Sequence, residues 1–282
     1  MSDIAIVTDS TAYLSESYIK QYDIHVLPLK VIWGAESFDD NVDITPEEFY
    51  KRLQESEEMP TTSQVTVAEF KKLFESLHSQ GKEVLCVVIS SEISGTLASA
   101  EAAKVEIPEA KIALVDSRTT IVDLAFQVLV AARAARSGAS LEECVSAVEQ
   151  DKQNSGVIFA VDTLEFLHRG GRIGGARRLL GTVLNIKPIL TLTDGKVDAL
   201  EQTRTRKKSL HRLVEIAAER VEGKQNLRLG VAHADAPNEA AALLKDASER
   251  LKPVETMIAQ MSPVIGTHVG PGTLALTYHF EG

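Results

Sequence analysis

Short apolar runs rich in β-branched residues alternate with amphipathic helical patterns in the first half of the chain. The runs predict strands at residues 4–7, 25–31, 84–89 and 112–115. The patterns between and after them predict helices at residues 45–56, 67–80, 96–105, 120–137 and 141–151. The first of these helices has Thr45 as its N-cap and Pro46 at its first position. Strands that alternate with helices are typical of an α/β sandwich with a largely parallel sheet.

A strand-like run at residues 156–161 opens the second half of the chain. After a basic region broken by glycines comes a hairpin pattern at residues 189–200, with Asp194 and Gly195 at its turn. Further patterns predict helices at 207–222 and 238–251 and strands at 227–232, 254–260 and 273–280. We place the domain boundary just before the strand-like run at residues 156–161. We therefore expect two domains, residues 1–155 and 156–282.

Composition and charge narrow the classes of function. The 282 residues suffice for a sizeable core, and a net charge of -10 argues against a general nucleic-acid or anionic-membrane surface. Cys86 and Cys144 lie in an apolar run and a helical pattern, where buried thiols are more common than a disulfide or a metal site. The chain starts without a signal-type segment, and its most apolar stretch, residues 121–135, contains charges and is short for a membrane span. We therefore expect a cytoplasmic protein without a membrane span.

Three polar segments follow apolar runs and could together receive a small anion. They are residues 61–64 (Thr-Thr-Ser-Gln), residues 94–96 (Ser-Gly-Thr) and the glycine-rich residues 266–272 around His268. They offer hydroxyls, backbone N–H groups at predicted helix starts and one imidazole. The first segment is equally well explained by simple capping of the next helix by Ser63 or Thr66. The combination favours holding a ligand over transforming it.

The sequence gives little support to catalysis. A serine hydrolase could use Ser94, but the pattern lacks a G-x-S-x-G elbow and an obvious base with an orienting acid. Asp9 and Asp116 could form a carboxylate pair, yet their Ser and Thr neighbours favour capping roles at strand ends. No spacing of His, Cys, Asp or Glu predicts a metal site.

Two basic segments stand out in this acidic chain, at residues 168–178 and 204–208. The first resembles an RGG segment, but it is embedded in apolar periodic sequence, so we do not expect nucleic-acid binding. A surface that docks a partner or handles phosphate is the better interpretation, with solvated charge as the alternative.

In this order, the motifs of the chain resemble the DegV family of bacterial fatty-acid-binding proteins, called FakB where they serve a fatty acid kinase. The matching motifs cover nearly the whole chain and are Thr8-Asp9-Ser10-Thr11, Pro60-Thr61-Thr62-Ser63-Gln64, Ser94-Gly95-Thr96, Val115-Asp116-Ser117, Gly170-Gly171-Arg172-Ile173, Ile186-Lys187-Pro188-Ile189, Gly266-Thr267-His268 and Gly270-Pro271-Gly272.

The resemblance implies a Rossmann-like N-terminal α/β domain with a mostly parallel sheet, a mixed C-terminal α/β domain and the ligand between them. It implies no cofactor, no metal and no catalytic residue. The residues implied to bind a fatty-acid carboxylate are Thr62, Ser94 and His268, with Thr61, Ser63 and Gly95 secondary. The residues implied to face a phosphate or the partner are Arg172, Arg204 and Arg206.

The function implied is that of a lipid-binding carrier. It would enclose one long-chain fatty acid and present the carboxylate to a separate kinase, which forms the acyl phosphate for phospholipid synthesis, with transient membrane contact at most. The alternatives are a Ser/His-dependent acyl hydrolase and a lipid chaperone or regulator without a kinase partner. Residues 118–126 depart from the small residues and glycine common in the family, and their bulk could reshape or shorten the cavity.

Overall fold

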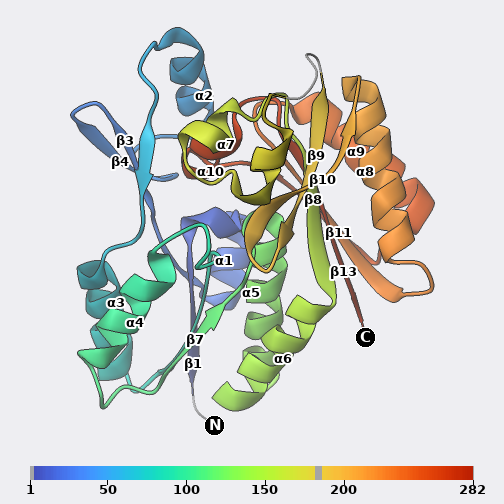
Figure 1. Ribbon diagram of the computed structural model, residues 1–282. Coiled ribbons are helices and arrows are strands. Elements are labelled where there is room, and N and C mark those ends of the chain that lie inside the picture. The colour runs from blue at the N-terminus through green and yellow to red at the C-terminus, as the bar shows by residue number, and fades with distance from the viewer. Residues whose placement is uncertain (1–2, 182–185, 282) are drawn as a thin grey trace.

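The computed structural model describes residues 3–181 and 186–281 and is built around two main β-sheets (Figure 1). The first sheet has the strand order β2-β1-β6-β7, and all of its strands are parallel. Its strands are β1 (Ile4–Asp9), β2 (His25–Leu27), β6 (Glu83–Val88) and β7 (Ile112–Asp116). Helices α3 (Val67–Ser79) and α4 (Thr96–Val105) cover one face, and α5 (Ile121–Arg136) and α6 (Leu141–Gln153) cover the other. The α/β class is as predicted.

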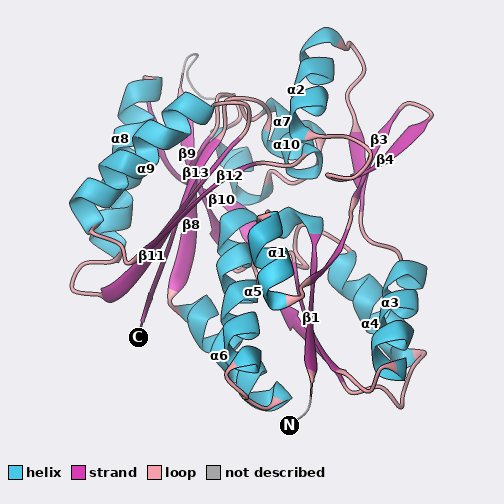
Figure 2. Cartoon of the chain, turned by 180° about the vertical axis from the view of Figure 1, so that it is seen from behind, coloured by secondary structure: helices cyan, strands magenta, loops and turns pink. Residues whose placement is uncertain are grey.

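The second sheet is mixed and has the order β10-β9-β8-β13-β11-β12. Its strands are β8 (Ser155–Ala160), β9 (Lys187–Thr193), β10 (Lys196–Thr203), β11 (Gln225–His233), β12 (Glu255–Gln260) and β13 (Leu274–Glu281). Figure 2 shows α8 (Arg206–Arg220) and α9 (Pro237–Leu251) on its outer face. The hairpin between β9 and β10 turns at Asp194 and Gly195, both with positive φ, as a two-residue type I′ turn requires.

A small antiparallel sheet, β4-β3-β5, stands apart from the other two and precedes α3. It contains β3 (Lys30–Trp33), β4 (Glu36–Asp39) and β5 (Thr61–Ser63), and α2 (Pro46–Glu55) lies between β4 and β5 in the chain. Thr45 caps α2 as predicted, because its hydroxyl accepts from Glu48 N–H and the Glu48 carboxylate accepts from Thr45 N–H.

Three expectations from the sequence were wrong in detail. The run at 25–31 is two strands in different sheets, because Pro28 and Leu29 break it. Residues 61–63 form β5, not a turn at a helix start, and Thr66 caps the helix that follows. Most of the glycine-rich segment around His268 is helical, since α10 covers Pro263–Val269. The sequence analysis also missed two helices and two 3₁₀ segments, namely α1 (Glu16–Tyr22), α7 (Glu165–Arg169), Ser10–Ala12 and Gly174–Leu179.

The predicted boundary falls at the start of β8, which Ser155 begins. The division into domains 1–155 and 156–282 stays a prediction, because α5 packs against strands of both main sheets. In the described part of the chain, no helix combines the length and the apolar character needed to span a lipid bilayer.

Helix α5 is the centre of the molecule. Its first nine residues are all buried, and it contacts β1 and β6 of the first sheet and β8, β11, β12 and β13 of the second. A charged residue on such a helix needs a partner. Asp123 finds one in His279 of β13, whose Nε2 lies 2.7 Å from Asp123 Oδ1, while Nδ1 lies 2.9 Å from Asp151 Oδ2 of α6.

Opposite charges stabilise this buried triad of Asp123, Asp151 and His279. Burial alone would lower the pKa of His279, but the carboxylates of Asp123 and Asp151 raise it above its ordinary value. Burial alone would raise the pKa of Asp151, but His279 and Arg228 hold it below its ordinary value. The triad therefore connects α5, α6 and β13 through an imidazole whose charged form is favoured by the two carboxylates beside it.

Replacing His279 with leucine should lower the free energy of unfolding at pH 7 by roughly 3–5 kcal/mol, because Asp123 would stay buried without a cation and Asp151 would keep only Arg228. His233→Leu is the matched control: its imidazole is also buried, and no carboxylate of the described residues lies within ion-pair distance of it. Urea unfolding followed by circular dichroism measures both variants. Equal losses in the two variants would contradict a stabilising role of the triad.

The two histidines should also differ in pH dependence. The pKa of His279 is raised, so its contribution is complete below the unfolded-state pKa of about 6.5 and is lost as the pH rises through the folded-state pKa. Burial lowers the pKa of His233, so that residue weakens folding as the pH falls below about 6.5.

Candidate functional site

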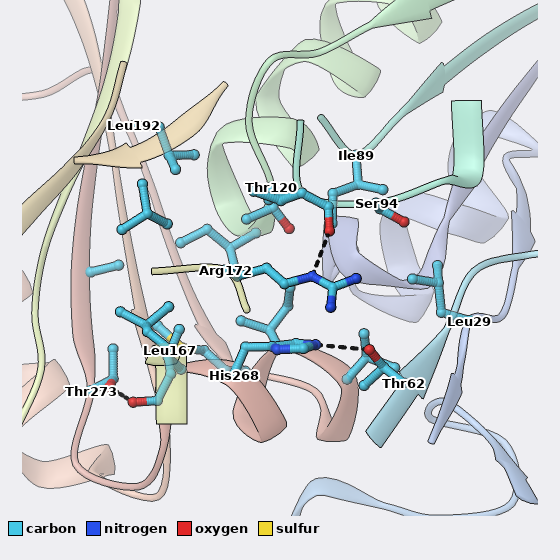
Figure 3. A pocket seen from close by; sticks show the side chains of 18 of the residues that line it. Leu29, Thr62, Ile89, Ser94, Thr120, Leu167, Arg172, Leu192, His268 and Thr273 are labelled. Atoms are coloured by element: carbon cyan, nitrogen blue, oxygen red, sulfur yellow. Dashed lines mark hydrogen bonds between the residues drawn. The ribbon is translucent and has the colours of Figure 1, made fainter. Parts of the chain in front are cut away.

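A cavity lies where β5, the starts of α4 and α5, helix α10 and the strands β8, β9 and β13 come together (Figure 3). Its atom-free space, including the part open to solvent, is about 830 Å³. Most of the wall is apolar and includes Leu29, Ile89, Phe159, Leu192, Met261 and Ile265. The polar side chains of the wall are Thr62, Ser63, Gln64, Ser94, Thr120, Arg172, His268 and Thr273. An apolar cavity with a few polar groups is the usual form of a small-molecule site.

Thr62 and His268 meet in this cavity although 206 positions separate them in the chain, and Thr62 Oγ1 lies 2.8 Å from His268 Nε2. Side chains alternate along a strand, so β5 directs Thr62 toward the cavity, while Thr61 is exposed and does not line it. Helix α10 carries His268 in its last turn.

The imidazole of His268 is neutral at physiological pH. Burial, aided by the charge of Arg172, lowers its pKa to about 4. Among the described residues, no group hydrogen-bonds to the buried Nδ1. An orphaned N–H is costlier than an orphaned lone pair, so the proton belongs on Nε2, which then donates to Thr62 Oγ1. The Thr62 O–H is left to donate to a ligand oxygen.

Gly170 makes room for this imidazole. A Cβ at residue 170 would lie 2.2 Å from His268 Nδ1, so only glycine permits the ring to pack there. The motif Gly170-Gly171-Arg172 thus serves the cavity from α7 and the turn after it.

Arg172 lies inside the cavity, where Figure 3 shows its guanidinium between Ser94 and His268. Its Nη1 donates to the carbonyl of Gly170 at 2.8 Å and its Nε to the carbonyl of Ile93 at 3.2 Å. Within the described residues, no carboxylate lies within ion-pair distance of this guanidinium. Its positive charge is therefore held in place but not neutralised, and it faces a largely apolar cavity.

Ser94 contributes a hydroxyl that is not activated. Its Oγ lies 2.9 Å from Thr96 Oγ1 and accepts from Thr96 N–H at 3.3 Å. Gly95 lines the cavity beside it, and a Cβ at Gly95 would lie 3.3 Å from the Gln64 side chain. The imidazole of His268 is occupied by Thr62, so the Ser/His pair of a hydrolase is not formed.

The other predicted residues lie elsewhere. Arg206 pairs with Glu239 at 3.0 Å and with Asp162 at 3.6 Å, and the exposed Arg204 is also outside the cavity. Asp9 accepts from Thr11 and from Ile89 N–H, as the predicted capping role requires. The site roles themselves stay predictions.

The sequence analysis assigned Arg172 to a partner-facing surface and did not name Thr120 and Ile121 as site residues, although both line the cavity. The signal in the sequence was the glycine pair before Arg172, because glycine permits the close approach of backbone and side chains that a cavity wall requires. Thr120 and Ile121 belong to the bulky segment 118–126, so part of that bulk does face the cavity.

Known proteins resemble this chain over its whole length. Residues 3–281 match the model of a family described as uncharacterised proteins of the DegV family. A DegV domain-containing protein of Halalkalibacterium halodurans is 36% identical over 282 residues, which cover 100% of both chains. Protein DegV of Bacillus subtilis is 34% identical over 280 residues, 99% of this chain and 100% of that protein.

Solved structures have the same fold. A DegV family protein from Thermus thermophilus, described by its fatty acid binding, has a TM-score of 0.94 at 33% identity and covers 99% of this chain and 100% of its own. DegV from Bacillus subtilis, described as a fatty acid binding protein, has a TM-score of 0.91 at 33% identity and covers 100% of both chains.

The packing of His268 on Gly170 can be tested with Gly170→Ala. The new Cβ should displace the imidazole from its buried place, so the pKa of His268 should rise from about 4 toward its ordinary value of 6.5. NMR titration of the imidazole measures this pKa. Gly95→Ala is the control, because its Cβ meets only the flexible Gln64 side chain. An unchanged pKa in Gly170→Ala would show that the ring does not depend on this contact.

Proposed function

This chain belongs to the DegV family, and on that premise we propose that it binds a long-chain fatty acid and presents the carboxylate to a separate kinase. The proposal has a binding part and a presentation part. The cavity supports the first, and the surface around Arg204 bears on the second.

The unneutralised guanidinium of Arg172 carries the proposal. A fixed cation in an apolar cavity is costly unless an anion joins it, so the cavity favours a ligand with a negative head group. Thr62 and Ser94 line the same cavity, and their hydroxyls can donate to carboxylate oxygens. A neutral His268 supports this arrangement by orienting Thr62.

The apolar wall suits the other end of such a ligand. Each buried CH₂ group contributes about 0.8 kcal/mol, so an acyl chain binds strongly but without direction. Hydrogen bonds to the head group then fix its register in the cavity. The related proteins from Thermus thermophilus and Bacillus subtilis are named for fatty acid binding, which agrees with this division of roles.

Presentation to a kinase is the finer part of the proposal. The chain has no P-loop pattern and no kinase-type glycine loop, so phosphoryl transfer would need a partner that supplies ATP and metal ions. A lipid chaperone or regulator that binds the same fatty acid without a kinase is one alternative.

A hydrolase is the other alternative, and the hydrogen bonds of Ser94 and His268 disfavour it.

Mass spectrometry of lipid extracted from natively purified protein tests the binding part. The wild type and Thr61→Val should contain an unmodified long-chain fatty acid, whereas Thr62→Val should bind it about tenfold more weakly because one hydrogen bond to a charged group is lost. The two variants make the same change on opposite faces of β5. Absence of lipid, or equal binding by both variants, would contradict the site. Release of product from an acyl ester by the protein alone would favour the hydrolase.

Arg204→Glu tests the presentation part. Arg204 is exposed, and no carboxylate of the described residues lies within ion-pair distance of it, so it can receive an anionic partner surface. With ATP and a bacterial fatty acid kinase, this variant should yield less acyl phosphate at unchanged fatty acid content. Lys245→Glu is the control, because it reverses another exposed positive charge, in α9. No phosphorylation of the wild-type ligand would favour the chaperone alternative.

A further inference from the structure

Asp40 is a buried carboxylate that the proposed function does not use. It follows β4, is 1% exposed, and no cation of the described residues pairs with it. Burial raises its pKa to about 6, and hydrogen bonds, chiefly from Ser10, keep it from rising further. A buried carboxylate that no cation of the described residues neutralises is costly enough to need an explanation.

Its hydrogen bonds connect three distant segments. Oδ2 accepts from the Ser10 hydroxyl at 2.7 Å, and that hydroxyl accepts from Leu29 N–H at 3.1 Å. Oδ1 accepts from Val264 N–H at 3.2 Å, across 224 positions of sequence. Leu29 and Val264 both line the cavity, so Asp40 lies directly behind part of its wall.

The hydrogen bond from Val264 N–H to Asp40 caps the start of α10, which the residues next to the helix leave uncapped. Val264 N–H belongs to the first turn of α10, where backbone donors lack partners within the helix. Ser262 precedes the helix, but its side chain makes no capping hydrogen bond and accepts instead from Tyr13 O–H at 2.9 Å. Asp40 therefore caps α10 from another part of the chain.

Helix α10 depends on such anchors because it has only seven residues, too few to be stable alone. Val264 and His268 are four residues apart and so lie on one face of the helix, and both line the cavity. A shift of Val264 would carry His268 with it and lengthen the 2.8 Å contact with Thr62.

We infer that Asp40 is a positioning residue of the carboxylate site, which holds α10 so that His268 can orient Thr62. The inference rests on the proposed function for its effect on binding, but not for its effect on His268. Because Asn offers the same acceptor as Asp, the proposed role depends on the hydrogen bond from Val264 N–H and not on the charge of Asp40.

Asp40→Ala tests this in the full-length protein after removal of lipid, with two measurements. Displacement of the fluorescent fatty acid cis-parinaric acid should show affinity weakened by about tenfold or more. NMR titration should show the pKa of His268 rising from about 4 toward 6.5, as the imidazole leaves its buried place. Asp40→Asn keeps an acceptor for Val264 N–H and should restore both values in large part.

Asp151→Ala is the matched control, since it removes another buried carboxylate that hydrogen-bonds within the core but does not line the cavity. This control should lower stability and leave fatty acid affinity and the pKa of His268 unchanged.

If Asp40→Ala does not fold, Ser10→Ala replaces it as the test variant. Ser10→Ala removes the hydrogen bond that holds Asp40, so it should shift both measurements in the same direction.

The outcomes separate the two hypotheses. If the wild type does not bind cis-parinaric acid, the proposed function fails, and the pKa of His268 still tests the role of Asp40. If the wild type binds and the variant at Asp40 or Ser10 changes neither the affinity nor the pKa, the role of Asp40 is overturned. The role of Asp40 would also be overturned if Asp151→Ala changed the affinity and the pKa of His268 by the same amounts, because the effect would then come from a general loss of stability.

Discussion

The contact of His279 with Asp123 fixes the helix on which the rest of the molecule is arranged. Helix α5 touches both main sheets, so neither sheet can be placed without it. Its burial is almost complete from its first residue, which leaves no solvent to satisfy Asp123. The imidazole of His279 meets this need and connects β13 to α5 and α6. The two halves of the chain are thus held together by a polar contact as well as by apolar packing.

The cavity follows from that arrangement. With α5 between the sheets, its start at Thr120 and Ile121 lines one cavity together with residues of β5, β8, β9 and α10. Each of these segments contributes only one or two polar groups, and they converge because the sheets and α5 are rigid. A site of this kind does not depend on any single loop, which agrees with the proposed binding of a long apolar chain that is held at one end.

Sequence reasoning succeeded where structure is determined locally. The capping box of α2, the turn at Asp194 and Gly195, and the long periodic helices are all set by neighbouring residues. It failed at α10, where three glycines suggested a loop. That helix forms because Asp40 caps it and because Gly266 lets it pack against Tyr50, a contact between segments far apart in the chain. The polar groups of the cavity were found by type, but their pairing was not, since the bond between Thr62 and His268 depends on the whole fold.

Electrostatics explain why a neutral histidine belongs in a site for an anion. A charged imidazole beside Arg172 would put two cations in an apolar cavity, and one carboxylate could neutralise only one of them. Holding the pKa of His268 near 4 leaves a single positive charge, which matches a single carboxylate. The ring still donates a hydrogen bond and so directs the Thr62 hydroxyl toward the ligand. In the proposed function, Arg172 would balance the charge of the carboxylate, and His268 would set the direction of the hydrogen bond from Thr62.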